Sequence, residues 1–234
     1  MRPKAVFFDV GNTLLFAYPS VSEVCLELLR AAGHDRDLES IRDLIPVLDE
    51  YYEDRYRADD TFWTSDEGAN DVWVGMYSLL GRRLGVPDDE ATRLAADVYR
   101  AFGEPGRWRA YDDVRPAFER LRAADVRVGL ISNWDSRLER IFKGLGLEPL
   151  LDVVISSAAV GVHKPDPRIF ELACERVGVE PRECAHVGDH YYADVLGARA
   201  VGMTPVLIER HGPGCARDDV VRISSLDELE DALS

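Results

Sequence analysis

The chain has 234 residues, of which 46% are hydrophobic, and a formal net charge of −15. Its length suits one large domain or a main domain with an insert, if a domain takes about 150 residues. Acidic residues outnumber basic ones by 43 to 28, which disfavours nucleic acid as the main partner. No apolar run reaches the roughly 20 residues of a bilayer span, and residues 1–4 show no signal-peptide pattern, so we expect no secretory leader. We therefore expect no membrane association and a cytoplasmic location.

The first predicted element is the short apolar stretch 5–8, which runs directly into Asp9. The polar turn that follows contains Gly11 and Thr13. An acid followed by Gly-Asn is good turn chemistry, so this motif by itself favours a plain turn. The alternative is a catalytic carboxylate at the end of a buried strand.

Helical periodicity then persists for about 90 residues. Apolar residues between 21 and 29 fall on one helix face, and Gly33 marks a stop. Further helices are predicted over 38–57, 70–84 and 88–102, each bounded by Gly, Pro or Asp-rich steps. The segment 16–108 is thus predicted to be a helical insert.

From residue 111 onward, helices alternate with short apolar strands. Strands are predicted over 126–132, 151–156, 183–189 and 204–209, and helices over 114–124, 136–146, 166–178 and 193–202. Asp166 is the expected N-cap of the third of these helices, with Pro167 in its first turn. Ser225 and Glu228 have capping-box spacing for a last helix. This alternation predicts an α/β fold with a doubly wound parallel sheet formed by 1–15 and 109–234.

The four cysteines give no further constraint on the fold. Cys25, Cys174, Cys184 and Cys215 are widely spaced and contain no C-x-x-C pair. This spacing indicates neither a zinc site nor a disulfide framework. We expect reduced, mostly buried thiols.

Polar residues stand at several predicted strand ends, where ligands bind in open parallel sheets. Each has a plain structural interpretation: Ser132-Asn133 could cap a helix in competition with Asp135, and Lys164 could be a solvated loop lysine. Asp189 and Asp194 could be a helix cap and an exposed helical acid. Gathered at one edge, however, these side chains would provide what a phosphoryl group needs, namely a nucleophile, a cation, hydrogen-bond donors and oxygen ligands for Mg²⁺.

Four sequence motifs resemble the ordered motifs of the haloacid dehalogenase-like hydrolases. They are "FFDVGNTLL", "LISNWD", "HKPDPRIF" and "HVGDHYYAD". The insert after the first motif is similar to the first type of cap in that superfamily. The resemblance covers nearly the whole chain and implies an α/β core with a helical cap.

By this resemblance, Asp9 is the nucleophile that becomes an aspartyl-phosphate. Ser132 and Asn133 are expected to bind the phosphate, as is Thr13 of the first motif. Lys164 is the cation that holds both the nucleophile and the phosphate. The expected substrate is a small phosphorylated molecule.

The resemblance also implies a Mg²⁺ site. Its ligands would be Asp9, the backbone carbonyl of Gly11, and Asp189, with Asp194 as a further ligand or a supporting acid. Phosphatases of the family have a second Asp at the position of Gly11, which protonates the leaving oxygen and then activates water. Its loss is typically worth about 10²- to 10⁴-fold in rate, whereas a glycine keeps the carbonyl.

Three functions remain open on this sequence. The first is a Mg²⁺-dependent phosphatase with impaired acid catalysis, in which His190, Asp135 or a cap residue replaces the missing acid. The second is a haloacid dehalogenase, which needs no proton donor for a leaving halide, although the retained fourth motif speaks against it. The third is a catalytically weak or inactive member that binds a phosphorylated ligand or a protein partner.

The insert is expected to set the substrate. Aromatic residues of the insert that could form a lid over the site are Phe16, Tyr18, Phe62, Trp63 and Trp73. They could equally pack the insert's own core. Arg55 and Arg57 could meet an anionic substrate or lie on a solvated helix face. The sequence does not indicate an oligomeric state.

Overall fold

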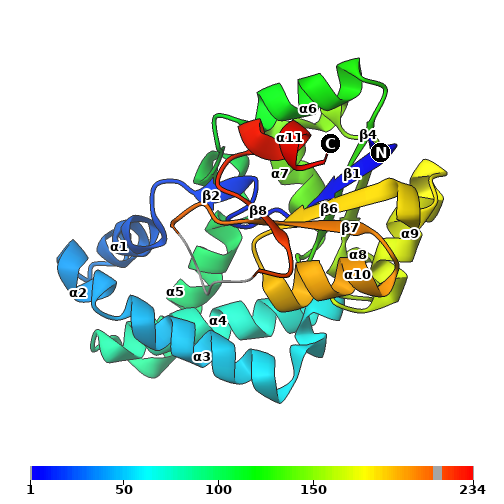
Figure 1. Ribbon diagram of the computed structural model, residues 1–234. Coiled ribbons are helices and arrows are strands. Elements are labelled where there is room, and N and C mark those ends of the chain that lie inside the picture. Colours follow the sequence, from blue (N-terminus) through cyan, green and yellow to red (C-terminus); the bar gives the residue numbers. More distant parts are fainter. Residues whose placement is uncertain (1, 213–217, 234) are drawn as a thin grey trace.

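A six-stranded parallel sheet forms the centre of the molecule (Figure 1). The computed structural model describes residues 2–212 and 218–233, so Cys215 lies outside the described residues. The strands follow the order β5-β4-β1-β6-β7-β8. They are β1 (Ala5–Phe8), β4 (Arg127–Ser132), β5 (Val153–Ser156), β6 (Cys184–Gly188), β7 (Thr204–Ile208) and β8 (Val221–Ile223). The prediction of a parallel α/β sheet is confirmed.

Helices cover both faces of this sheet because the side chains of a strand alternate between them. Val6 and Phe8 of β1 pack into the core beneath α6, α7 and α11, whereas Ala5 and Phe7 face α9 and α10. The helix bounds are α6 (Val114–Ala123), α7 (Leu138–Gly144), α8 (Ser157–Val160), α9 (Pro167–Val177), α10 (Gly197–Ala200) and α11 (Leu229–Ala232). A π-helical turn, η5 (Tyr191–Leu196), precedes α10.

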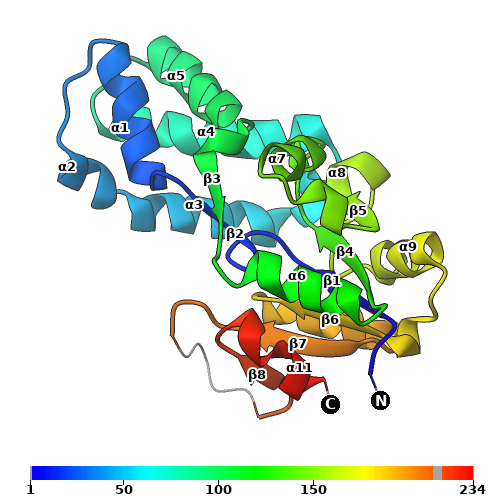
Figure 2. The ribbon, with the colours of Figure 1, turned by 90° about the horizontal axis from the view of Figure 1, so that it is seen from above.

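Between β2 (Leu15–Ala17) and β3 (Trp108–Ala110) the chain is helical, as expected. The helices are α1 (Val21–Ala31), α2 (Leu38–Arg42), α3 (Ile45–Ala58), α4 (Asp66–Arg83) and α5 (Asp88–Ala101). They share a core of their own, and Figure 2 shows them to one side of the sheet. The predicted boundaries of this segment fall within β2 and β3, which pair antiparallel. The division into core and cap domains stays a prediction.

Several short elements differ from the sequence prediction. The predicted helix 38–57 is broken into α2 and α3, with a proline in the first turn of α3. Helix α4 begins four residues before the predicted start, because the Ser65 side chain caps it by accepting from the Gly68 N–H at 3.0 Å. The pair β2 and β3 and the edge strand β8 were not predicted. The caps at Asp166 and Ser225 are confirmed.

Short 3-10 turns complete the described chain. They are η1 (Asp60–Thr64), η2 (Pro105–Arg107), η3 (Glu148–Leu150), η4 (Pro181–Glu183) and η6 (Leu226–Glu228). Cys25, Cys174 and Cys184 are buried free thiols, as expected. No helix in residues 2–212 and 218–233 combines the length and the apolar character that crossing a bilayer requires.

Candidate active site

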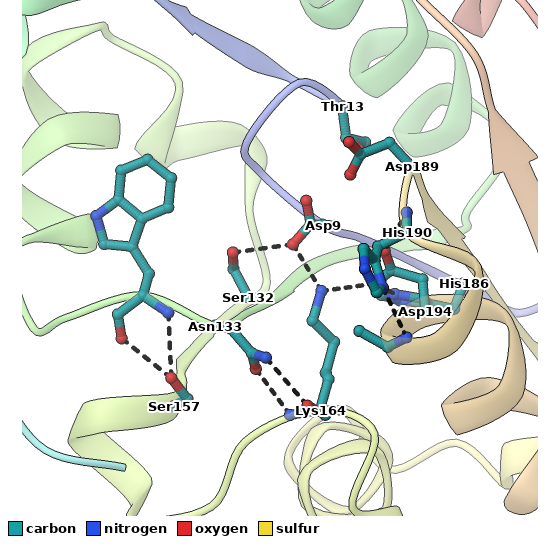
Figure 3. A network of polar contacts seen from close by, with 12 residues as sticks. Asp9, Thr13, Ser132, Asn133, Ser157, Lys164, His186, Asp189, His190 and Asp194 are labelled. Atoms are coloured by element: carbon teal, nitrogen blue, oxygen red, sulfur yellow. Dashed lines mark hydrogen bonds and ion pairs between the residues drawn. The ribbon is translucent and has the colours of Figure 1, made fainter. Parts of the chain in front are cut away.

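Asp9 lies at the carboxyl end of β1, where the strand leaves the core. Its Oδ1 accepts hydrogen bonds from Ser132 Oγ at 3.0 Å and from Lys164 Nζ at 2.6 Å (Figure 3). Among the described residues nothing donates to Oδ2, and Asp9 lines a large cavity. One carboxylate oxygen is therefore held in place, while the other accepts no hydrogen bond from the described residues.

Lys164 joins Asp9 to a second buried acid. Its Nζ also donates to Asp194 Oδ1 at 2.6 Å, and only 2% of the lysine is exposed. Burial disfavours the charged ammonium, but the carboxylates of Asp194 and Asp9 outweigh this and raise the pKa of Lys164. The lysine is thus a fixed cation beside Asp9 rather than a solvated loop residue.

Asp194, in the π-helical turn η5, accepts hydrogen bonds from three protein groups. Its Oδ1 accepts from His186 Nε2 at 2.8 Å as well as from Lys164, and its Oδ2 accepts from the His190 N–H at 3.0 Å. Burial opposes its charge, but Lys164 and His186 outweigh burial and lower the pKa of Asp194. Both oxygens of this carboxylate already hold protein groups in position. His186 was not singled out from the sequence, although an ionisable residue inside the apolar strand β6 is a usable signal.

Asn133 holds the lysine loop rather than facing Asp9. Its Nδ2 donates to the Lys164 carbonyl at 3.0 Å, and its Oδ1 accepts from the Lys164 N–H at 2.7 Å. Figure 3 shows this amide turned toward the backbone of Lys164, whereas Ser132 points at Asp9. The predicted phosphate contact of Asn133 stays a prediction; in this structure the amide fixes Lys164.

Three carboxylates could hold a metal ion. Asp9, Asp189 and Asp194 each offer an oxygen, and these oxygens lie within 4.8 Å of one another. Partial desolvation by the surrounding protein, together with the charges of Asp9 and Asp194, raises the pKa of Asp189 to about 8, although the residue still has exposed surface. The Thr13 hydroxyl lies 3.5 Å from Asp189 Oδ1. Oxygen donors crowded in this way fit a hard divalent cation, which would relieve their mutual repulsion.

The candidates for the missing acid differ in their availability. Asp135 is 2% exposed and receives Arg137 Nε at 2.8 Å, Arg137 Nη2 at 2.6 Å and the Tyr99 hydroxyl at 3.1 Å, so it is committed to structural bonds. His190 lines the cavity, but its Nδ1 accepts from the Ala193 N–H at 3.0 Å. A Cβ on Gly11 would meet the Trp134 ring at 3.7 Å, an ordinary contact.

A cavity of about 490 Å³ extends from Asp9 and Asp189 into the helical segment. Of the predicted aromatic lid, Phe16, Trp63 and Trp73 line it. Phe62 instead packs in a cluster with Ala69 and Val72. The remaining predicted cap residues, Tyr18, Arg55 and Arg57, are exposed and are not part of the described lining.

The family assignment follows from comparison with known proteins. The family model of the haloacid dehalogenase-like hydrolases matches residues 3–202. The chain belongs to this family. It is 34% identical over 230 residues to the human haloacid dehalogenase-like hydrolase domain-containing protein 3, covering 96% of this chain and 88% of that protein. The mouse protein of the same name is 40% identical over 69% of this chain, a match that spans 65% of that protein.

Relatives with named activities include both a phosphatase and a dehalogenase. Glyceraldehyde 3-phosphate phosphatase of Methanopyrus kandleri is 31% identical over 88% of this chain and 84% of its own length. (S)-2-haloacid dehalogenase 4A of Burkholderia cepacia is 36% identical over 89% of this chain and 84% of its own length. The putative hydrolase YfnB from Bacillus subtilis has the same fold, with a TM-score of 0.79, 20% identity and complete coverage of both chains. The chain is therefore a hydrolase of this family. Because its relatives include both activities, the reaction has to be inferred from the residues of the site.

Proposed function

We propose that this haloacid dehalogenase-like hydrolase is a Mg²⁺-dependent phosphatase that acts on a small phosphorylated molecule through Asp9. The observation that carries the proposal is the arrangement around Asp9, which lines the cavity with Oδ1 anchored by Ser132 and Lys164 and with Oδ2 free of hydrogen bonds from the described residues. The nearby carboxylates of Asp189 and Asp194 would repel the carboxylate of a haloacid substrate. Together with Asp9 they could hold a divalent cation, which would offset the negative charge of a bound phosphate.

In the proposed reaction, Asp9 Oδ2 attacks phosphorus in line with the ester oxygen. A bond forms between the carboxylate and phosphorus while the bond from phosphorus to the ester oxygen breaks, and the leaving oxygen keeps the electron pair. With Gly11 in place of an acid, that oxygen takes its proton from water. A water molecule then attacks phosphorus, which restores the Asp9 carboxylate and releases inorganic phosphate.

The chain's own groups prepare this chemistry. Lys164 places positive charge beside the attacking carboxylate, and Ser132 orients it. Asn133 and Asp194 keep Lys164 from moving. Asp9, Asp189 and the Gly11 carbonyl would hold Mg²⁺, which neutralises phosphate charge when bound.

We further propose that 1–15 and 109–234 form the catalytic core and that 16–108 is a cap. The cap supplies most of the cavity wall and would exclude water from the phosphorylated Asp9. Its contacts with the core support this assignment: the Ser157 hydroxyl donates to the Trp63 carbonyl at 2.6 Å, and the Tyr99 hydroxyl donates to Asp135.

The test is hydrolysis of an activated aryl phosphate by the native protein, with Mg²⁺ and after chelation, beside the isosteric variant Asp9→Asn. We expect phosphate release that requires Mg²⁺ and disappears in the variant. After acid quenching during turnover, the native protein should retain phosphate and the variant should not. Native release that persists in Asp9→Asn would remove Asp9 from the mechanism.

The dehalogenase remains the second candidate because Gly11 removes a proton donor that a halide does not need. A halide-release assay with a 2-haloacid, in the presence of a chelator, distinguishes it from the phosphatase. A family member that only binds its ligand would show neither activity. Hydrolysis abolished in Asp9→Asn would exclude that third possibility.

A further inference from the structure

A continuous aromatic wall leads from the helical segment to the nucleophile loop. Adjacent rings in it have centroids 4.9 to 6.2 Å apart. Its members, in spatial order and all lining the cavity, are Tyr52, Trp73, Tyr77, Phe102, Trp108 and Trp134. At the near end, the Trp134 ring lies against Gly11. The leaving group of a phosphate held at Asp9 would therefore lie against aromatic faces.

The same cavity has few positive charges that are free to bind an anion. Arg137 is the one Arg or Lys side chain in its described lining, and Asp135 receives two of its nitrogens while the Tyr99 carbonyl receives a third. The guanidinium also lies over the Tyr99 ring, 3.7 Å from its centroid. Asp49 adds an exposed acid to the lining. A second phosphate or a carboxylate on the leaving group would find acids and aromatic rings here, and no unpaired Arg or Lys.

The absence of an acid at Gly11 points in the same direction. Without a proton donor, the leaving oxygen must depart as an anion. The rate of ester cleavage then falls as the basicity of that anion rises. A phenol has a pKa of about 10, as in tyrosine, and its anion is far less basic than an alkoxide. Aryl esters are thus the phosphate esters that lose least from this glycine.

Resting on the proposed phosphatase function, we infer that the substrates are aryl phosphate monoesters whose leaving group is a large, uncharged aromatic ring system. Offset or edge-to-face contacts with the rings of the wall would hold the aromatic leaving group. The wall would then bind the aryl group, and by doing so it would select substrates whose leaving group needs no acid.

The first experiment compares kcat/KM for 2-naphthyl phosphate, phenyl phosphate, 4-carboxyphenyl phosphate and glycerol 3-phosphate. We expect the naphthyl ester to exceed glycerol 3-phosphate at least 100-fold, and the carboxyphenyl ester to fall at least tenfold below the phenyl ester. A preference for glycerol 3-phosphate, or no loss from the added carboxylate, would overturn the inference. A preference for choline phosphate would also overturn it, because the aromatic wall would then serve a cation.

Matched variants connect the preference to the wall. Trp73→Leu removes a ring of the wall, whereas Phe62→Leu removes a buried aromatic ring of the same segment that does not line the cavity. Trp73→Leu should lower the ratio of naphthyl to glycerol kcat/KM about tenfold, mainly through KM, and Phe62→Leu should leave the ratio unchanged. Equal ratios in both variants would contradict the role of the wall.

A binding measurement separates this inference from the proposed function. Quenching of tryptophan fluorescence by 2-naphthol, the product without phosphate, reports the wall alone in the native protein and in Trp73→Leu. Binding that weakens in Trp73→Leu supports the aromatic site even if no ester is hydrolysed, in which case only the phosphatase proposal fails. Hydrolysis without naphthol binding would leave the phosphatase standing and reject the aryl leaving group.

Discussion

At the scale of single residues, position 11 decides how the leaving group departs. Gly11 is not among the residues with positive φ, and a Cβ there would make an ordinary 3.7 Å contact with Trp134. Gly11→Asp should therefore fold and supply the missing acid. We expect kcat for an alkyl phosphate to rise by at least about 10-fold and by at most the 10²- to 10⁴-fold that acid catalysis typically contributes. The rise should be smaller for an activated aryl ester.

The control for this prediction is Gly11→Asn, which has the same size and no proton to give. If both variants change kcat equally, the effect is steric, and proton donation is not what limits the native protein. The comparison should be made at saturating Mg²⁺, so that altered metal affinity does not change the rate.

Cys25 gives a prediction on the alkaline side. Its side chain is 1% exposed in α1, and burial raises the pKa of the thiol to about 12. In the unfolded chain the thiol ionises near pH 8.5. Above that pH the folded protein keeps the thiol proton, and unfolding releases it. The free energy of unfolding should fall by about 1.4 kcal/mol per pH unit from this group.

Urea unfolding of the native protein and of Cys25→Ala at pH 8, 9 and 10 measures this contribution. The variant loses a fixed amount of packing at every pH, so the two stability curves should converge as pH rises. Curves that stay parallel across this range would show that Cys25 does not contribute to the pH dependence.

At the scale of elements, the first turn of α4 attaches the helical segment to the loop after β4. Asp66 accepts from the Ser136 N–H at 2.8 Å and from the Ser136 hydroxyl at 2.6 Å. Its neighbour Glu67 lies in the same helical turn, with no bond to that loop among the described contacts. Both acids stabilise the start of the helix by their negative charge, but among the described contacts only Asp66 also bonds the loop. Variants of the two therefore distinguish the loop attachment from the charge effect.

Asp66→Ala is expected to lower the free energy of unfolding by about 1 kcal/mol more than Glu67→Ala, since two hydrogen bonds are lost. It should also speed proteolysis within residues 60–66, because the segment opens more often. Urea unfolding and limited digestion of both variants measure this. Indistinguishable variants would mean that the Asp66 bonds do not hold the segment to the core.

Sequence patterns predicted the elements that have long apolar periods and clear caps. The sheet and the meeting of Asp9, Ser132, Lys164 and Asp189 followed from strand ends lying at one edge. The pair β2 and β3 has only three residues per strand, too few for a period to show. The turn of Asn133 toward the Lys164 backbone depends on the loop path, which composition does not encode.

The aromatic wall also lay beyond sequence reasoning. Trp73 was recognised as a candidate for either the lid or the packing of the insert, and the structure gives it both positions, since it packs against the insert's core and lines the cavity. Trp108 lies in β3 and Trp134 in the loop after β4, and only the tertiary fold brings their ring centroids to 4.9 Å.

At the scale of the whole molecule, the acidic site should couple cation binding to stability. The folded-state pKa of Asp189 is raised to about 8, whereas an unfolded Asp titrates near 3.9. Its contribution is therefore most favourable below pH 4 and is lost as pH rises toward 8. Without Mg²⁺ the native protein should melt lower at pH 8 than Asp189→Asn does, because the amide carries no charge to repel Asp9 and Asp194.

Mg²⁺ should reverse this order. At 100 times its Kd a cation that binds only the folded state contributes about 2.7 kcal/mol, which for a chain of this size corresponds to a rise in Tm of roughly 5 to 10 °C. Asp189→Asn should lose most of this rise, whereas Asp112→Asn, which removes an exposed acid outside the site, should keep it. An equal Mg²⁺ effect on all three proteins would mean that the cation acts on the overall charge of −15. The three carboxylates would then not form its binding site.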